Sequence, residues 1–126
     1  AACGNAGEEM VAYCFAEVPG YSSMGSYVGT GYSGTFINIG FKPRWIMIKR
    51  IDGSSNWNIR DTERDQNNPA NHRLMANQTN GEDIANGFDL NSNGFYLPDG
   101  DGDTNFLNGQ FIYMAFAENS MQYLPQ

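Results

Sequence analysis

Lys42-Pro43-Arg44-Trp45-Ile46-Met47-Ile48-Lys49-Arg50 is the stretch that indicates the fold class most directly. Its short apolar centre lies between basic residues, which is typical of a strand buried on both faces. We therefore expect a central strand here, with Trp45 in the core. Asp52–Asn56 then predicts a turn into a second strand at Trp57–Thr62, in which Trp57, Ile59 and Asp61 share one face.

The rest of the chain continues the pattern of short strands and turns. Further strands are expected at residues 10–17, 26–32, 34–39 and 111–118. Asn-Gly pairs tolerate the positive φ of tight turns and predict turns at residues 80–81, 86–87, 93–94 and 108–109. The polar residues 63–82 are expected to form a long loop with one helical turn near His72–Met75. The predicted fold is all-β: an antiparallel β-sandwich, jelly-roll or lectin-like, with about seven to ten short strands and little helix.

Length and charge limit the organisation and the partners. A chain of 126 residues suits one domain. We expect residues 1–9 to be an N-terminal extension or linker and residues 10–126 to form a single β-sandwich domain. The net charge of -7 argues against nucleic acid as a partner. No apolar run approaches the roughly 20 residues that cross a bilayer, which argues against membrane insertion.

Two segments far apart in the sequence are similar to each other. Met10–Glu17 (MVAYCFAE) and Phe111–Glu118 (FIYMAFAE) align without gaps at an offset of 101 residues, and the closing Phe-Ala-Glu is identical. One interpretation is a tandem array, in which residues 10–17 are equivalent to the last strand of a preceding copy. The other is that two strands of one sheet converged on similar patterning. In an array, the N-terminal strand could join the sheet of a neighbouring unit, which is a route to a fibre.

Several spaced motifs together resemble a known family. They are Val11–Glu17, Pro19–Ser22, Gly25–Gly31, Ile39–Arg50, Trp57–Asp61, Ser92–Phe95 and Phe111–Glu118. In this order they resemble a domain of uncharacterised function found in tail-fibre and other virion structural proteins of aquatic bacteriophages; the 63–82 loop does not match. The resemblance implies an extracellular or virion-surface module, assembled into fibres or appendages, for which host glycans are candidate ligands. It implies no catalytic residues.

An acidic segment near the C-terminal end raises the question of a metal. Asp99, Asp101, Asp103 and Asn105 place oxygen ligands at every second position, which suits Ca²⁺. Thr104 and Gln110 stand where an EF-hand needs Gly and Glu, so the segment is not an EF-hand. The alternative is a solvated acidic turn between two strands. We therefore expect no cofactor, with Ca²⁺ at this segment as the alternative.

Basic and apolar side chains supply candidate interface residues. The candidates for contact with other copies are Lys42, Arg44, Arg50, Arg60, Arg64, Met10, Tyr13 and Phe15. The basic ones could form a patch that faces acidic polysaccharide or another copy. Alternatively, they flank and solubilise one hairpin and pair with Asp52, Asp61, Glu63 and Asp65. The two cysteines, Cys3 and Cys14, could be either disulfide-bonded or free thiols.

Aromatic residues near loops provide an alternative function. Tyr21, Tyr27, Tyr32 and Trp57 could stack on sugar rings, or they could pack in the core or an interface. An enzyme would have to use Glu17 and Glu118 as a glycosidase carboxylate pair, but their matching positions suit a structural repeat better. We therefore expect a non-enzymatic structural subunit of an extracellular fibre or virion appendage, which forms trimers or filaments with copies of itself and contacts host surface polysaccharide. The alternatives are a monomeric carbohydrate-binding module and a polysaccharide-degrading enzyme.

Overall fold

The computed structural model describes residues 4–98 and 100–118. This part of the chain forms eight strands and contains no helix, which confirms the all-β prediction. The strands are β1 (Ser22–Val28), β2 (Phe36–Asn38), β3 (Pro43–Arg50), β4 (Asn58–Asp61), β5 (Ala70–Met75), β6 (Asp83–Asn91), β7 (Gly94–Tyr96) and β8 (Gln110–Ala117).

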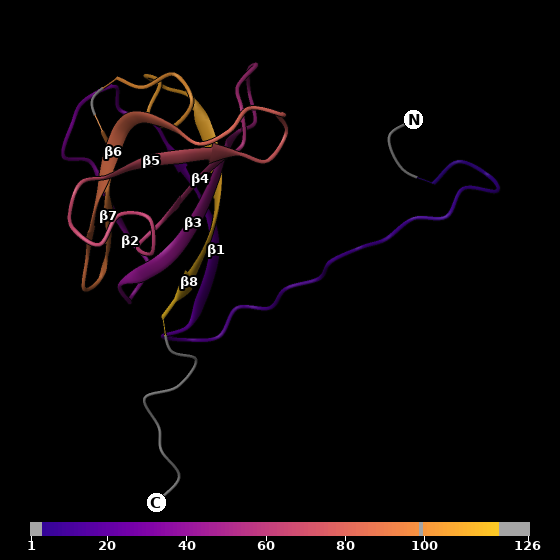
Figure 1. Ribbon diagram of the computed structural model, residues 1–126, viewed down its shortest axis with the longest axis horizontal. Coiled ribbons are helices and arrows are strands. Elements are labelled where there is room, and N and C mark those ends of the chain that lie inside the picture. The colour runs from indigo at the N-terminus through magenta and orange to yellow at the C-terminus, as the bar shows by residue number, and fades with distance from the viewer. Residues whose placement is uncertain (1–3, 99, 119–126) are drawn as a thin grey trace, which may run out of the picture.

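All eight strands belong to one hydrogen-bonded antiparallel sheet. Their order is β1-β8-β3-β4-β5-β6-β7-β2, so β1 and β2 are the two edges of a nearly closed sheet. The sheet curves so that β1, β8 and β3 face β6 and β7 across the interior (Figure 1). The last strand, β8, lies inside the sheet, between β1 and β3.

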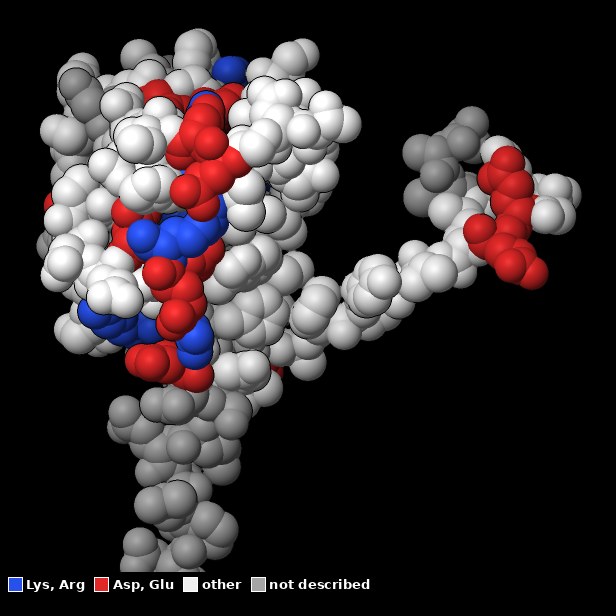
Figure 2. Space-filling model, viewed as in Figure 1, with Lys and Arg blue, Asp and Glu red and all other residues white. Residues whose placement is uncertain are grey.

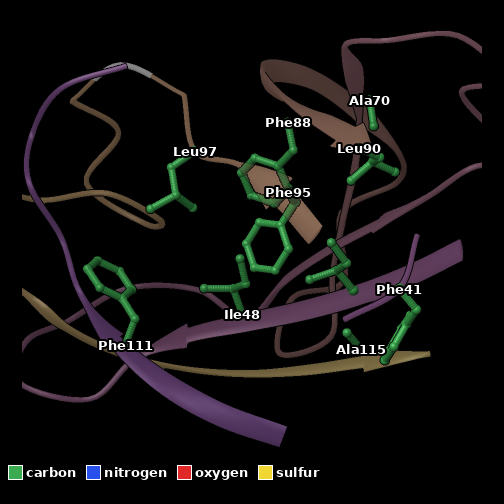
Figure 3. Packing of buried hydrophobic residues seen from close by; sticks show 10 residues of the cluster. Phe41, Ile48, Ala70, Phe88, Leu90, Phe95, Leu97, Phe111 and Ala115 are labelled. Carbon is green, nitrogen blue, oxygen red and sulfur yellow. The ribbon is translucent and has the colours of Figure 1, made fainter. Parts of the chain in front are cut away.

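The core lies between the two halves of the curved sheet. Ile48 of β3, Phe88 of β6, Phe95 of β7 and Phe111 of β8 are fully buried members of one cluster, in which the Phe88 and Phe95 rings lie 6.0 Å apart (Figure 3). Burying each of these side chains contributes about 2 kcal/mol of transfer free energy. Leu97, just after β7, closes the cluster.

The hairpin between β6 and β7 turns one residue before the predicted Asn93-Gly94 turn, at Ser92 and Asn93. Asn91 pairs with Gly94 across a two-residue turn that contains Asn93, and the Asn93 backbone N–H donates to Asn91 Oδ1 at 3.0 Å. Gly94 is buried because β2 lies directly against it: a Cβ at this position would overlap the Ile37 carbonyl. By contrast, the pair at residues 86–87 lies inside β6 and makes no turn.

The prediction of a long loop at residues 63–82 is wrong for the middle of this segment. Residues Ala70–Met75 form β5, which pairs with β4 and β6, and no helical turn is present there. Asp65 holds the start of this strand, because its carboxylate accepts the His72 backbone N–H at 2.7 Å and the His72 ring Nδ1 lies 2.6 Å away. The strand was missed because its residues are mostly polar: of the six, only Ala70 is buried, so the sequence shows no apolar alternation.

The predicted double-sided burial of β3 is correct for only one face. Ile46 and Ile48 are fully buried, whereas Trp45 and Met47 are half-buried on the outer face. Trp45 therefore lies outside the core, where its ring packs against Phe116 at 5.8 Å. Alternate residues of a strand point to opposite faces, so an uninterrupted apolar run can still serve one core and one outer surface.

Residues 10–17, here called the N-terminal arm, form no strand in this structure. The arm leaves the body in an extended path (Figure 1). Its contacts with the body are at its end: the Val18–Ser22 bridge, the Phe15–Phe116 ring contact at 5.6 Å, and the Glu17 carboxylate, which accepts the Met24 N–H at 2.9 Å. The prediction of a strand at residues 10–17 is therefore wrong, because these residues pair with no strand of the described sheet.

Replacing Gly94 with alanine should destabilise the fold. The added Cβ would overlap the Ile37 carbonyl, so the β2–β7 pairing must shift, and we expect a loss of about 2 kcal/mol in the free energy of unfolding. Urea unfolding followed by circular dichroism measures the change. Gly81→Ala is the control, because a Cβ there meets nothing within 4 Å. Equal stabilities of the two variants would contradict the packing described for Gly94.

Candidate functional site

A continuous apolar row crosses the outer face of the sheet. Met24 of β1, Met114 of β8 and Met47 of β3 are directly opposite one another in register. Ile59 of β4 continues the row beyond Met47, and Leu74 of β5 follows. We call these five residues the methionine row. Directly opposite residues share a face and contact one another, so the row is a property of strand register.

The methionine row borders a shallow hollow. Trp57 and Ile112 line a hollow of about 420 Å³ together with Met24, Met47 and Met114. Methionine side chains are flexible and polarizable, so such a surface adapts to an apolar partner. This lining contains no charged group, so it is suited to packing and lacks the acid and base groups that general acid–base catalysis uses.

The predicted basic cluster is largely paired with carboxylates. Arg44 contacts Glu63 at 2.7 Å, Arg50 contacts Asp52 at 2.7 Å, and Arg64 contacts Asp61 at 2.6 Å. Acidic and basic side chains accordingly alternate in one band on the body (Figure 2). Lys42 lines a second, polar hollow of about 460 Å³ together with Arg44, Glu63 and Glu118. The pairing supports the interpretation in which these charges flank and solubilise strands.

Arg60 lies in the interior and not on the basic surface that we predicted. It is fully buried, donates to Asn71 O at 2.6 Å and to Asn86 O at 3.1 Å, and stands over the Phe88 ring at 5.3 Å. Burial, and then the nearby Arg73, lower its pKa to about 10. Its guanidinium joins β4 to β5 and β6 at a point where these strands share few ladder bonds. The alternation of β4 places both Asn58 and Arg60 inward.

The four aromatic candidates for glycan binding do not form one platform. Tyr27 stacks on Phe111 at 5.0 Å and donates its hydroxyl to Thr104 O at 2.6 Å, and burial followed by Asp101 raises the pKa of Tyr27 above its ordinary range. Trp57 lines the hollow beside the methionine row. Tyr21 and Tyr32 flank opposite ends of β1: Tyr21 packs edge-on against Phe116, and Tyr32 is 71% exposed.

Residues 100–105 of the acidic segment hold neighbouring loops together through hydrogen bonds. Asn105 is fully buried; its amide donates to Tyr32 O and Pro98 O at 2.8 Å each, and its oxygen accepts the Thr30 N–H at 2.9 Å. Asp101 accepts the Asp103 N–H at 2.7 Å. Asp99 lies outside the described residues. Within the described ranges, no group of three or more His, Cys, Asp or Glu side chains could hold a metal ion. Calcium binding at this segment stays a prediction.

Arg73 is the basic partner of two acidic residues in this region, Asp83 and Asp103. Its guanidinium bonds Asp83 at 2.9 and 2.5 Å and lies 3.6 Å from Asp103. The hydrogen bond from Arg73 is the main cause that holds the pKa of Asp83 below its ordinary value of 3.8. These contacts tie β5 and β6 to the loop before β8.

The remaining predicted residues are exposed. Met10, Tyr13 and Phe15 project from the N-terminal arm, more than half exposed. Cys14 is exposed as well, and Cys3 lies outside the described residues, so the question of their pairing stays open. The Glu17 carboxylate accepts a backbone N–H, and Glu118 lies at the rim of the polar hollow; nothing here assigns catalysis to either.

Sequence reasoning missed the methionine row. The signal lay in alternate positions of three separate strands, Met24, Met47 and Met114. Period-two patterning places each residue on one of two faces, but it does not say which strands are neighbours or how they are aligned. The row becomes visible only when β8 is placed between β1 and β3.

Together these features define a small all-β domain, built from one nearly closed antiparallel sheet with an apolar row on its outer face. The chain belongs to the family described as "Domain of unknown function (DUF7483)", which matches residues 1–120. The chain matches no curated protein and no solved structure. The described part of the chain has no helix with the length and apolar character needed to cross a membrane.

The buried arginine generates a stability prediction. Arg60→Lys should lower the free energy of unfolding by about 2 kcal/mol, because one ammonium cannot reach both the Asn71 and Asn86 carbonyls in the geometry of a guanidinium. The control is Arg44→Lys, whose partner Glu63 is exposed, and we expect less than about 1 kcal/mol there. Thermal and urea unfolding of both variants measure the difference. Equal effects would contradict the bridging role of Arg60.

Asp83 generates a pH prediction. Its folded pKa lies below the unfolded value of 3.8, so its ion pair contributes stability above that pH and loses this contribution as the pH falls through the folded pKa. Asp83→Asn should therefore lower stability at neutral pH and flatten its acid-side decline. Melting temperatures recorded across this pH range test the effect. Asp89→Asn, an exposed change in the same strand, should follow the wild-type profile. An unchanged slope in Asp83→Asn would contradict the assignment.

Proposed function

We propose that this domain is a structural subunit of an extracellular fibre or virion appendage and that it assembles with copies of itself. The observation that carries the proposal is the apolar outer face with the methionine row. Ile112 and Leu74 on this face are each 37% exposed, and Val28 at the sheet edge is 59% exposed. Contiguous apolar surface of this kind marks interaction sites in soluble proteins.

The size of the face bears on a contact between copies. Strands about 4.8 Å apart and about 23 Å long give β1, β8, β3, β4 and β5 a projected face of roughly 500 Å². A stable interface buries about 800 Å² of accessible surface on each partner. The face therefore supplies a large part of such a contact, and a stable assembly would also bury surface beside the methionine row.

The chemistry of the chain favours a copy as the occupant. Every copy presents the same apolar methionine row, so a symmetric contact can pack one row against another, with Lys49, opposite Ile112 in register, at its margin. Arg44, Arg50 and Arg64 are already paired with carboxylates within the domain. The resemblance to virion structural proteins supports an extracellular or virion-surface location and leaves host glycans as candidate ligands.

Particle size tests the proposal directly. Light scattering and electron microscopy of native protein should show trimers, filaments or another regular oligomer. Ile112→Lys places a charge in the hollow and should give a 13.9 kDa monomer with an unchanged circular dichroism spectrum.

The control is Leu107→Lys. Leu107 is 52% exposed in the loop before β8, outside the strands that carry the methionine row, so this variant should assemble as the wild type does. A wild-type monomer at high concentration would overturn the proposal. Assembly that survives Ile112→Lys would also overturn the assigned face.

A further inference from the structure

The N-terminal arm places large apolar side chains in water. Val11 is 79% exposed, Tyr13 83%, Phe15 57% and Met10 52%. Their backbone is extended and makes no ladder bonds with the described sheet. A strand-like segment with this much uncovered apolar surface is suited to insertion into another sheet.

The arm carries the burial pattern of β8. At the offset of 101 residues, Cys14 and Ala16 match Ala115 and Ala117, which point inward in β8. Ala115 is fully buried beside Phe41 in the core (Figure 3). Cysteine is the next size of small apolar side chain after alanine, so Cys14 suits this position.

The outward positions match as well. Val11, Tyr13 and Phe15 align with Ile112, Met114 and Phe116, which line the outer face of β8. In the second half of β8 the large residues point outward and Ala115 and Ala117 point inward, which is the reverse of the β3 pattern, where Ile46 and Ile48 point inward. In the first half of β8, Phe111 and Tyr113 point inward, where the arm has Met10 and Ala12. The arm therefore fits the position of β8 better than it fits the position of β3. The one large difference is Ala12, which aligns with Tyr113.

The arm cannot occupy this position in its own sheet. β8 already lies between β1 and β3. Only the turn Val18–Tyr21 separates the arm from β1, and Val18 and Ser22 bond each other across it. The equivalent residues Phe15 and Phe116 touch at 5.6 Å with their rings at 64°. The C-terminal end of the arm and the C-terminal end of β8 thus lie side by side, next to the first residues of β1.

We propose that the N-terminal arm is the β8-equivalent last strand of a preceding unit of the same fold in a tandem array. The preceding unit then ends with a central strand, and the chain passes through the turn Val18–Tyr21 directly into β1 of this unit. The family match at residues 1–120 includes the arm together with the body. This inference goes beyond the proposed function, because it concerns how units join along one chain, whatever the array builds.

A two-unit chain tests the join. It consists of residues 18–109 followed directly by residues 9–126, so that Cys14 is its one cysteine and the arm is the one segment placed to supply the last strand of the upstream unit. The probe is iodoacetamide. Cys14 is exposed in the single-unit chain and should react readily there. In the two-unit chain it would be buried as Ala115 is, and its alkylation should slow by at least about 100-fold.

Equal reactivity of Cys14 in the two chains would overturn the inference. The reference for the rate is the single-unit chain with Cys3→Ser, so that both chains carry one thiol. This readout is a thiol reaction rate, so its outcome is separate from the particle size that tests self-assembly.

A graft within the single-unit chain provides a second measurement. Phe111→Met, Ile112→Val, Tyr113→Ala, Met114→Tyr and Ala115→Cys together give β8 the sequence of the arm. The grafted chain should fold cooperatively, with a lower urea midpoint than the wild type because the Tyr113 ring is missing and Met replaces the buried Phe111 ring. The control has the same composition but exchanges the last two residues (Met114→Cys, Ala115→Tyr), which puts a large ring at a fully buried position and should prevent folding. A grafted chain that is as unfolded as its control would overturn the inference.

Discussion

The insertion of β8 between β1 and β3 is the constraint on which the rest of the structure depends. β1 has no other partner strand in the described sheet, and β3 reaches β1 only through β8. Pairing the two ends of the chain closes a long loop, so this step carries a large entropic cost that ladder bonds and core burial must offset. Once it is formed, the inward side chains of β8 complete the core against β6 and β7.

The same register also builds the outer surface. Because alternate residues point to opposite faces, aligning Ala115 with Ile46 inside necessarily aligns Met114 with Met47 and Met24 outside. The core and the methionine row are thus two consequences of one alignment. A shift of a single residue would exchange the faces, exposing the core side chains of β8 and burying its outer ones.

Polar groups hold the other half of the sheet, where ladder bonds are sparse. Arg60 joins β4, β5 and β6 from inside, Arg73 joins β5 and β6 to the loop that holds Asp103, and Asn105 fastens the loop after β1 to residues near Pro98. A buried guanidinium is costly to desolvate, and its two bonds to backbone carbonyls offset that cost. The charges of this chain accordingly serve the fold more than they form a basic surface patch.

The sequence by itself determined the all-β class, the strands around Trp45–Ile48 and Phe111–Glu118, and, to within one residue, the turn at Ser92–Asn93. These features depend on local propensity and on neighbours in the chain, which the order of residues specifies. Tertiary structure alone decided that Arg60 is inside, that Trp45 is outside, that residues 70–75 form a strand, and that residues 10–17 leave their own sheet. Period two divides a strand into two faces, but only the placement of neighbouring strands decides which face meets the core.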